Sequence, residues 1–214
     1  NLQPNTTLLD MDGNIIGHRG PHIGRPLKMA EMPSYLPNAF LAIEDERFYE
    51  HTGVDRKAIA RAFFANTKSG TTRQGGSTLT QQLVKNMLLT PDKNYRRKFQ
   101  EMWLAYEMEQ VLSKPEILEL YLNRIDLGNR SFGVEAAARR YFGKSAKDLT
   151  QREAALLAAV LPSPNKWRLD PPGPYVSKRA STLQARRKVG GSDGVAAWVL
   201  VAQDVRRSAP KRPA

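Results

Sequence analysis

Three consecutive carboxylates and a histidine lie close together in this sequence. Glu44, Asp45 and Glu46 directly follow an apolar stretch at positions 39–43, and His51 comes five residues later. Glu44, at the end of that stretch, is a candidate general base. His51 is a candidate metal ligand or proton carrier, although histidines that cap a helix or satisfy the core are more frequent. Taken alone, the cluster is equally compatible with a solvated helix face.

A glycine-rich turn precedes a second group of polar side chains. The segment Gly75-Gly-Ser-Thr-Leu-Thr-Gln-Gln82 is followed by Lys85 and Asn86. Backbone N–H groups at a helix start, together with hydroxyl groups, form a favourable environment for phosphate oxygens. The segment lacks the spacing of a P-loop, and an ordinary N-capped helix after a loop is the alternative.

The third group consists of four cations that precede one carboxylate. Lys93 and the run Arg96-Arg97-Lys98 come shortly before Glu101. Such cations can hold a diphosphate through charge-assisted hydrogen bonds, and arginine can do so in a bidentate way. The alternative is a solvated basic turn.

The elements that must position these groups are predicted to be mainly α-helical. A helix over 95–112 places Phe99, Trp103 and Tyr106 on one stripe with Met102, which predicts a packed face. Further helices are expected at about 116–123, 133–141 and 151–161, two of them begun by capping boxes at Ser113 and Thr150. Residues 1–36 are predicted to be extended, with a hairpin turn at Asp12-Gly13.

Composition limits the class of protein. The chain has 214 residues and a formal net charge of +12. It has no cysteine, which excludes disulfides, thiolate zinc sites and cysteine nucleophiles. Its longest apolar run, at positions 154–161, is far shorter than a membrane span. Residues 1–165 carry a charge of 22 − 18 = +4 and residues 166–214 carry 11 − 3 = +8. Nucleic acid, an anionic lipid surface and a phosphate-bearing ligand all suit that charge.

In this order, the segments resemble the motifs of the peptidoglycan glycosyltransferases of family 51, found in monofunctional transglycosylases and class A penicillin-binding proteins. The resembling segments are Glu44-Asp45-x-x-Phe48-x-x-His51-x-Gly53, Gly75–Gln82 with Lys85-Asn86, Arg97-Lys98-x-x-Glu101, Ile117–Asn123 and Gly133–Gly143. Gln100 departs from the pattern, because some members carry a lysine there, and this leaves one cation fewer.

The resemblance implies a mainly α, lysozyme-like head with a smaller membrane-facing jaw lobe. It suggests an N-terminal extended lead-in at 1–35, a glycosyltransferase domain at 36–190 with the jaw lobe within 54–95, and a basic C-terminal tail at 191–214. The implied reaction polymerises lipid II into β-1,4-linked glycan with inversion, releasing undecaprenyl diphosphate. A lysozyme-like peptidoglycan hydrolase is the alternative, and a nucleic-acid-binding module is a third hypothesis that lacks a recognisable reading helix.

The resemblance also implies roles for single residues. Glu44 and Glu101 are the expected catalytic carboxylates, with Glu44 as the base. Either one is a candidate ligand for a divalent cation, Mg²⁺ or Mn²⁺. The expected substrate-binding residues are Asp45, Phe48, Gly76, Ser77, Thr78, Gln81, Gln82, Lys85, Asn86, Lys93, Arg97, Lys98, Tyr121 and Asn123.

The implied partners are lipid II, the lipid-linked growing glycan and the membrane surface. A transpeptidase or another cell-wall synthesis protein is a further candidate partner, and nucleic acid is not expected. The implied location is the outer, periplasmic face of a bacterial cytoplasmic membrane, with the natural N-terminal anchor absent from this chain.

Overall fold

The computed structural model describes residues 6–13, 15–69, 76–89 and 95–185, and these residues are mainly helical, as predicted. The α-helices are α1 (Tyr35–Glu44), α2 (Arg56–Ser69), α3 (Leu79–Leu88), α4 (Tyr95–Val111), α5 (Lys114–Arg124), α6 (Val134–Phe142), α7 (Gln151–Ala159) and α8 (Pro174–Ala185). Short 3-10 helices are η1 (Met29–Glu31), η2 (Phe48–Glu50) and η3 (Ala146–Asp148). The strands are β1 (Thr6–Leu9), β2 (Ile15–Arg19), β3 (His22–Ile23) and β4 (Ser131–Phe132).

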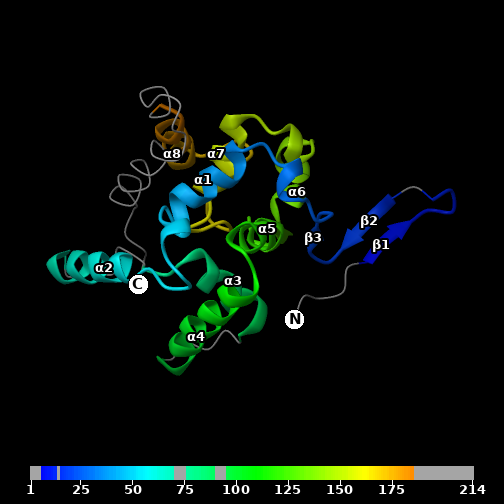
Figure 1. Cartoon of the computed structure of the whole chain (residues 1–214). Helices are drawn as coiled ribbons and strands as arrows, with labels where there is room; N and C mark the ends of the chain where they lie inside the picture. Colours follow the sequence, from blue (N-terminus) through cyan, green and yellow to red (C-terminus); the bar gives the residue numbers. More distant parts are fainter. Residues whose placement is uncertain (1–5, 14, 70–75, 90–94, 186–214) are drawn as a thin grey trace.

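The hydrophobic core lies among α1, α5, α6, α7 and α8, which gather on one side of the molecule (Figure 1). Helix α7 packs against both α1 and α8, and its residues from Ala154 to Ala159 are all buried. The alanines allow the neighbouring helices to approach closely, while Leu36 and Phe40 of α1 fill the space between them. This packing fixes the C-terminal end of α1, where Glu44 lies.

Helices α2, α3 and α4 lie on the other side of the molecule (Figure 1). Helix α3 packs against both α4 and α5, so it connects this side to the core. Helices α2 and α3 fall within the range 54–95 predicted for the jaw lobe. The boundaries of that lobe stay a prediction, and the predicted tail at 191–214 lies outside the described residues.

The predicted helix starts are confirmed. Both capping boxes are formed, with Ser113 paired to Glu116 and Thr150 paired to Glu153. A third box, Thr78 with Gln81, begins α3. In each box a side-chain oxygen accepts from a backbone N–H group that has no partner within the helix.

The N-terminal hairpin is also confirmed. Strands β1 and β2 pair in the antiparallel sense, and Gly13 in the turn has a φ of +85°. A second, parallel pair joins β3 to β4. The β1–β2 hairpin projects away from the helices (Figure 1).

The prediction of a packed aromatic stripe on α4 is wrong. The exposed fractions are 71% for Phe99, 66% for Trp103 and 47% for Tyr106, and Tyr95 is 90% exposed. Spacing along the helix placed these side chains on one face but could not say what covers it. Within the described residues, no helix has the length and apolar character needed to cross a membrane.

Candidate active site

Glu44 is the last residue of α1 and lies half-buried between the core and α3. Its Oε2 accepts a hydrogen bond of 2.8 Å from Nε2 of Gln82 on the first turn of α3. The rigid end of α1 and this amide together orient the carboxylate. Gln82, a predicted substrate-binding residue, therefore contacts Glu44, the predicted base.

A small polar pocket, open to solvent, lies at Glu44, which is one of its lining residues. The carboxylates of Glu46 and Asp55 line it together with Arg61 of α2 and with Ser77, which precedes α3 in the chain. Arg61 donates a hydrogen bond of 3.0 Å to Glu46, so part of the negative charge is balanced. The pocket places several polar side chains next to the Glu44 carboxylate, where they can contact a hydroxyl group that approaches from solvent.

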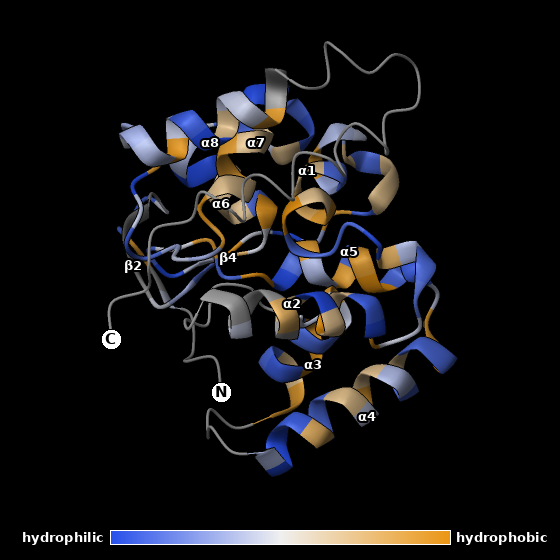
Figure 2. Cartoon of the chain, turned by 90° about the vertical axis from the view of Figure 1, so that its left-hand side faces the viewer, coloured by the Kyte–Doolittle hydropathy of each residue, from blue (hydrophilic) through white to orange (hydrophobic). Residues whose placement is uncertain are grey.

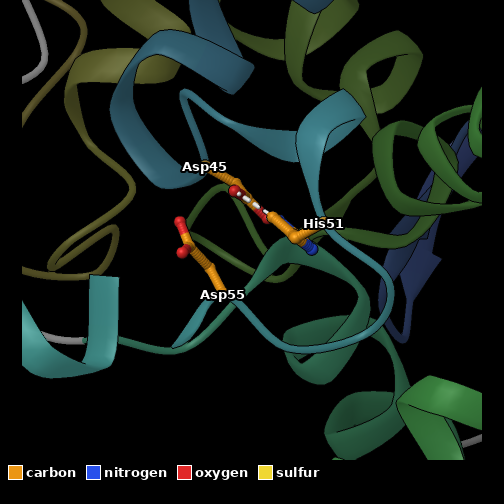
Figure 3. A group of neighbouring side chains, drawn as sticks. All are labelled: Asp45, His51 and Asp55. Carbon is orange, nitrogen blue, oxygen red and sulfur yellow. Dashed lines mark hydrogen bonds and ion pairs between the residues drawn. The ribbon is translucent and has the colours of Figure 1, made fainter. Parts of the chain in front are cut away.

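Asp45, His51 and Asp55 come together at this pocket, which both aspartates line (Figure 3). His51 Nε2 lies 2.9 Å from Asp45 Oδ1, and the other Asp45 oxygen accepts a 2.9 Å bond from the backbone N–H of Leu79. Asp55 accepts bonds from the Arg47 guanidinium and from the backbone N–H at the start of α2. The three side chains are spaced closely enough to hold a metal ion. Both carboxylates already have protein partners, however, and these bonds join the segment 45–55 to α2 and α3.

The cations of the third motif surround a buried carboxylate on α4. Glu101 is 3% exposed, and its two oxygens lie 3.1 Å from Arg97 Nε and 2.7 Å from Lys98 Nζ. Lys98 Nζ also donates to Ser77 Oγ at 2.9 Å. Ser77 therefore belongs both to the pocket beside Glu44 and to this cation group, which brings the second and third motifs together.

A divalent cation does not fit at Glu101, because each carboxylate oxygen already faces a protein cation. Within the described residues, neither Glu44 nor Glu101 belongs to a group of three acidic or histidine side chains spaced to hold a metal. A divalent cation at Glu44 or Glu101 stays a prediction.

Several residues predicted to bind substrate are buried instead. Their exposed fractions are at most 5%, although Asp45 and Thr78 still line the pocket at Glu44. Whether any of them contacts a substrate stays a prediction. These residues are Asp45, Phe48, Thr78, Gln81 and Tyr121.

The buried residues have identifiable supporting roles. Thr78 caps α3 and donates to the carbonyl oxygen of Gly53, which fixes the helix start. Tyr121 lies near Glu44 and Asp45; burial raises the pKa of its hydroxyl, and the two negative charges raise it further, so it stays protonated. The half-buried Asn123 pairs with both the N–H and the carbonyl of Leu27, which anchors the lead-in segment to α5.

The remaining predicted residues are accessible. Ser77, Lys85 and Asn86 are exposed, whereas Gly76, Arg97 and Lys98 are half-buried. Lys93 lies outside the described residues.

Sequence reasoning missed a buried ion pair that joins the motifs. Glu109 of α4 lies 2.9 Å from Lys114 of α5, and it accepts from the Gly53 N–H at 2.6 Å and from the Thr80 hydroxyl. Lys114 Nζ lies 4.3 Å from the centroid of the Phe48 ring. The capping box indicated the helix start at Ser113, but no spacing in the sequence links Gly53 to a residue 56 positions later.

Known proteins share much of this sequence. The family model described as Transglycosylase matches residues 12–189. Penicillin-binding protein 1A of Vibrio cholerae is 49% identical over 164 residues, which cover 77% of this chain and 20% of that protein. The protein of the same name from Neisseria gonorrhoeae is 46% identical over 161 residues, or 75% of this chain and 20% of that one. The chain thus spans about one fifth of the length of these relatives.

A crystal structure of penicillin-binding protein 1A from Haemophilus influenzae aligns with a TM-score of 0.48 at 26% identity, covering 93% of this chain and 20% of that one. The family match extends over most of the chain and includes every segment that contributes to the site described above. The chain belongs to the transglycosylase family.

Proposed function

We propose that this chain is a peptidoglycan glycosyltransferase that polymerises lipid II at the outer face of a bacterial cytoplasmic membrane. The growing lipid-linked glycan is the donor and lipid II is the acceptor. A transpeptidase, on the same or on a separate polypeptide, is the partner that would act on the product.

In the proposed step, Glu44 accepts the proton of the acceptor 4-hydroxyl group. The hydroxyl oxygen attacks the anomeric carbon of the donor from the face opposite the leaving group, so the new bond has inverted configuration. The bond between that carbon and the diphosphate oxygen breaks, and its electron pair leaves with undecaprenyl diphosphate. Arg97, Lys98 and Lys85 stabilise the charge that develops on the diphosphate.

One observation carries this proposal. Ser77 lines the pocket beside Glu44 and also accepts from Lys98 of the cation group. A single substrate complex can therefore have its attacking hydroxyl at the carboxylate and its departing diphosphate at the cations. Membership of the transglycosylase family agrees with this arrangement.

The lysozyme-like hydrolase is not favoured. A hydrolase of that kind needs a carboxylic acid to protonate a sugar leaving group. Glu101, the second carboxylate, is instead paired with the two cations Arg97 and Lys98, an arrangement that suits an anionic leaving group. The family model also names a transglycosylase.

Incubation of the chain with labelled lipid II in detergent tests the function. We expect labelled glycan polymer, together with release of undecaprenyl diphosphate in proportion to the bonds formed. Digestion of the product by a muramidase provides the control that it is β-1,4-linked glycan. Cleavage of finished glycan without any polymer formation would contradict the proposal.

The exposed aromatic face of α4 supports attachment to a membrane surface. Tyr95, Phe99, Trp103 and Tyr106 follow one another at intervals of three or four residues, so they share one side of the helix. Helix α4 lies at the end of the molecule opposite α7 and α8 in both views (Figures 1 and 2). Aromatic side chains with nearby cations are typical of helices that lie in the membrane interface.

Replacing both Phe99 and Trp103 with serine is expected to weaken binding to vesicles of phosphatidylglycerol and phosphatidylethanolamine at least tenfold. Full burial of one such side chain contributes about 1.5–3 kcal/mol, so partial burial of two suffices for about tenfold. Vesicle co-sedimentation measures the change. The matched control is Met11→Ser, since Met11 is fully exposed and belongs to the turn of the β1–β2 hairpin, which lies away from α4 (Figure 1). Equal loss in both variants would contradict a specific role for α4.

A further inference from the structure

The Lys98 ammonium group contacts several polar side chains of the cation group around Glu101. Its nitrogen lies 2.7 Å from Glu101 Oε2 and 2.9 Å from Ser77 Oγ, whereas Gln81 Oε1 is at 3.5 Å. An ammonium group has three N–H donors. Two of them are used in short bonds, and the third makes only a long contact, so it is available to an oxygen atom of a bound diphosphate.

Glu101 holds this ammonium group in place. The carboxylate is buried on α4 one turn after Lys98, and Arg97 lies against its other oxygen at 3.1 Å. The Lys98 side chain is 43% exposed, so a ligand can reach it from solvent while it stays paired with Glu101. A divalent cation that bridges a protein to a phosphate has a protein carboxylate on one side and the phosphate on the other. Lys98 would lie between Glu101 and a bound diphosphate in the same way.

Electrostatics opposes adding such a metal ion here. The two positive charges of Arg97 and Lys98 already exceed the single negative charge of Glu101. A divalent cation bound to that carboxylate would be repelled by both side chains. In the part of the chain that the structure describes, one group of three acidic or histidine side chains is spaced closely enough to hold a metal ion. That group is Asp45, His51 and Asp55, and it does not include Glu101.

We propose that Lys98 takes the place of a bridging divalent cation between Glu101 and the leaving diphosphate, so that glycan formation by this chain needs no metal ion. This inference rests on the proposed glycosyltransferase function. When the donor bond breaks, the electron pair moves to the diphosphate oxygen, and Lys98 balances the new charge without transferring its proton. The position of Lys98 between Ser77 and Glu101 determines where the diphosphate is held.

Metal removal and rescue together test the inference. Polymerisation of lipid II by the unmodified chain should change less than twofold when EDTA is added. Lys98→Ala should be strongly impaired, and Mn²⁺ should restore its activity at least tenfold, because Glu101 Oε2 is then free to bind a metal. The double variant Lys98→Ala/Glu101→Gln should lose that response.

A matched control separates this role from a general loss of positive charge. Arg96 lies next to Arg97 on α4 and is exposed. Among the described residues, the ion pairs of Glu101 are with Arg97 and Lys98 and not with Arg96. Arg96→Ala should therefore show no Mn²⁺-dependent gain. Loss of activity in EDTA by the unmodified chain, or an absence of Mn²⁺ rescue in Lys98→Ala, would overturn the inference.

Binding of Mn²⁺ alone, followed by electron paramagnetic resonance without any substrate, keeps the two proposals distinguishable. Lys98→Ala should bind one more Mn²⁺ ion than Lys98→Ala/Glu101→Gln does, and the unmodified chain should match the double variant. If this holds while the unmodified chain forms no glycan with or without metal, the proposed function fails and the site assignment stands. If Lys98→Ala gains no ion, the inference fails whatever the activity is.

Discussion

Replacing Glu44 with glutamine is expected to lower the rate of glycan polymerisation by about 10²–10⁴-fold, the usual contribution of a general base. The carboxylate lies at the rigid end of α1, beside the pocket, where it can accept a proton from a bound hydroxyl group. Glutamine has nearly the same shape but a far less basic oxygen. Its amide oxygen can still accept the hydrogen bond from Gln82, so the local structure should persist.

Steady-state polymerisation rates measure this effect, and circular dichroism with thermal unfolding checks the fold. Glu50→Gln is the matched control, because Glu50 is a carboxylate of the same segment that is exposed and paired with Arg47. We expect the control to retain most of its activity. A Glu44→Gln chain that still polymerises lipid II at a near-normal rate would refute the assignment of the base.

Local signals predicted the helical framework well. The capping boxes at Ser113 and Thr150 and the Asp12-Gly13 turn depend on neighbouring residues only, and all three are formed. The position of Glu44 at a helix end was similarly accessible, because an apolar helical stretch stops there. Such features are determined by propensities and short-range hydrogen bonds, which a single sequence contains.

The environment of each side chain was much less accessible. Phe48 belongs to a motif but is fully buried under Lys114, whereas Trp103 belongs to a regular stripe but is largely exposed. Both outcomes depend on which distant segment packs against the residue. Periodicity gives the face of a helix and does not give its neighbour, and for α4 the missing neighbour is the membrane in our proposal.

The ion pair of Glu109 and Lys114 is the second feature for which we expect a large effect. Glu109→Leu should lower the free energy of unfolding by about 3 kcal/mol, near the lower end of the range for breaking a buried pair, because Lys114 keeps one fifth of its surface exposed. The substitution leaves the Lys114 charge, the Gly53 N–H and the Thr80 hydroxyl without their common acceptor. Urea unfolding monitored by tryptophan fluorescence measures the change.

Two further variants separate the charge from the packing. Glu109→Leu/Lys114→Met removes both charges and should recover part of the loss, since an apolar pair of similar volume often replaces a buried ion pair at little cost. Arg25→Met removes an exposed ion pair with Glu31 and should cost less than about 1 kcal/mol. A Glu109→Leu chain as stable as Arg25→Met would contradict the proposed importance of the pair.

The same substitution should also affect catalysis, because Glu109 holds the segment that follows Glu44 against α3. It binds Gly53 at the end of that segment and Thr80 on the first turn of α3, which also carries Gln82, the partner of Glu44. We therefore expect kcat of Glu109→Leu to fall at temperatures where the chain is still folded. Glu109→Gln retains an oxygen acceptor of the same reach and should restore most of that activity, which a simple loss of folded protein would not explain.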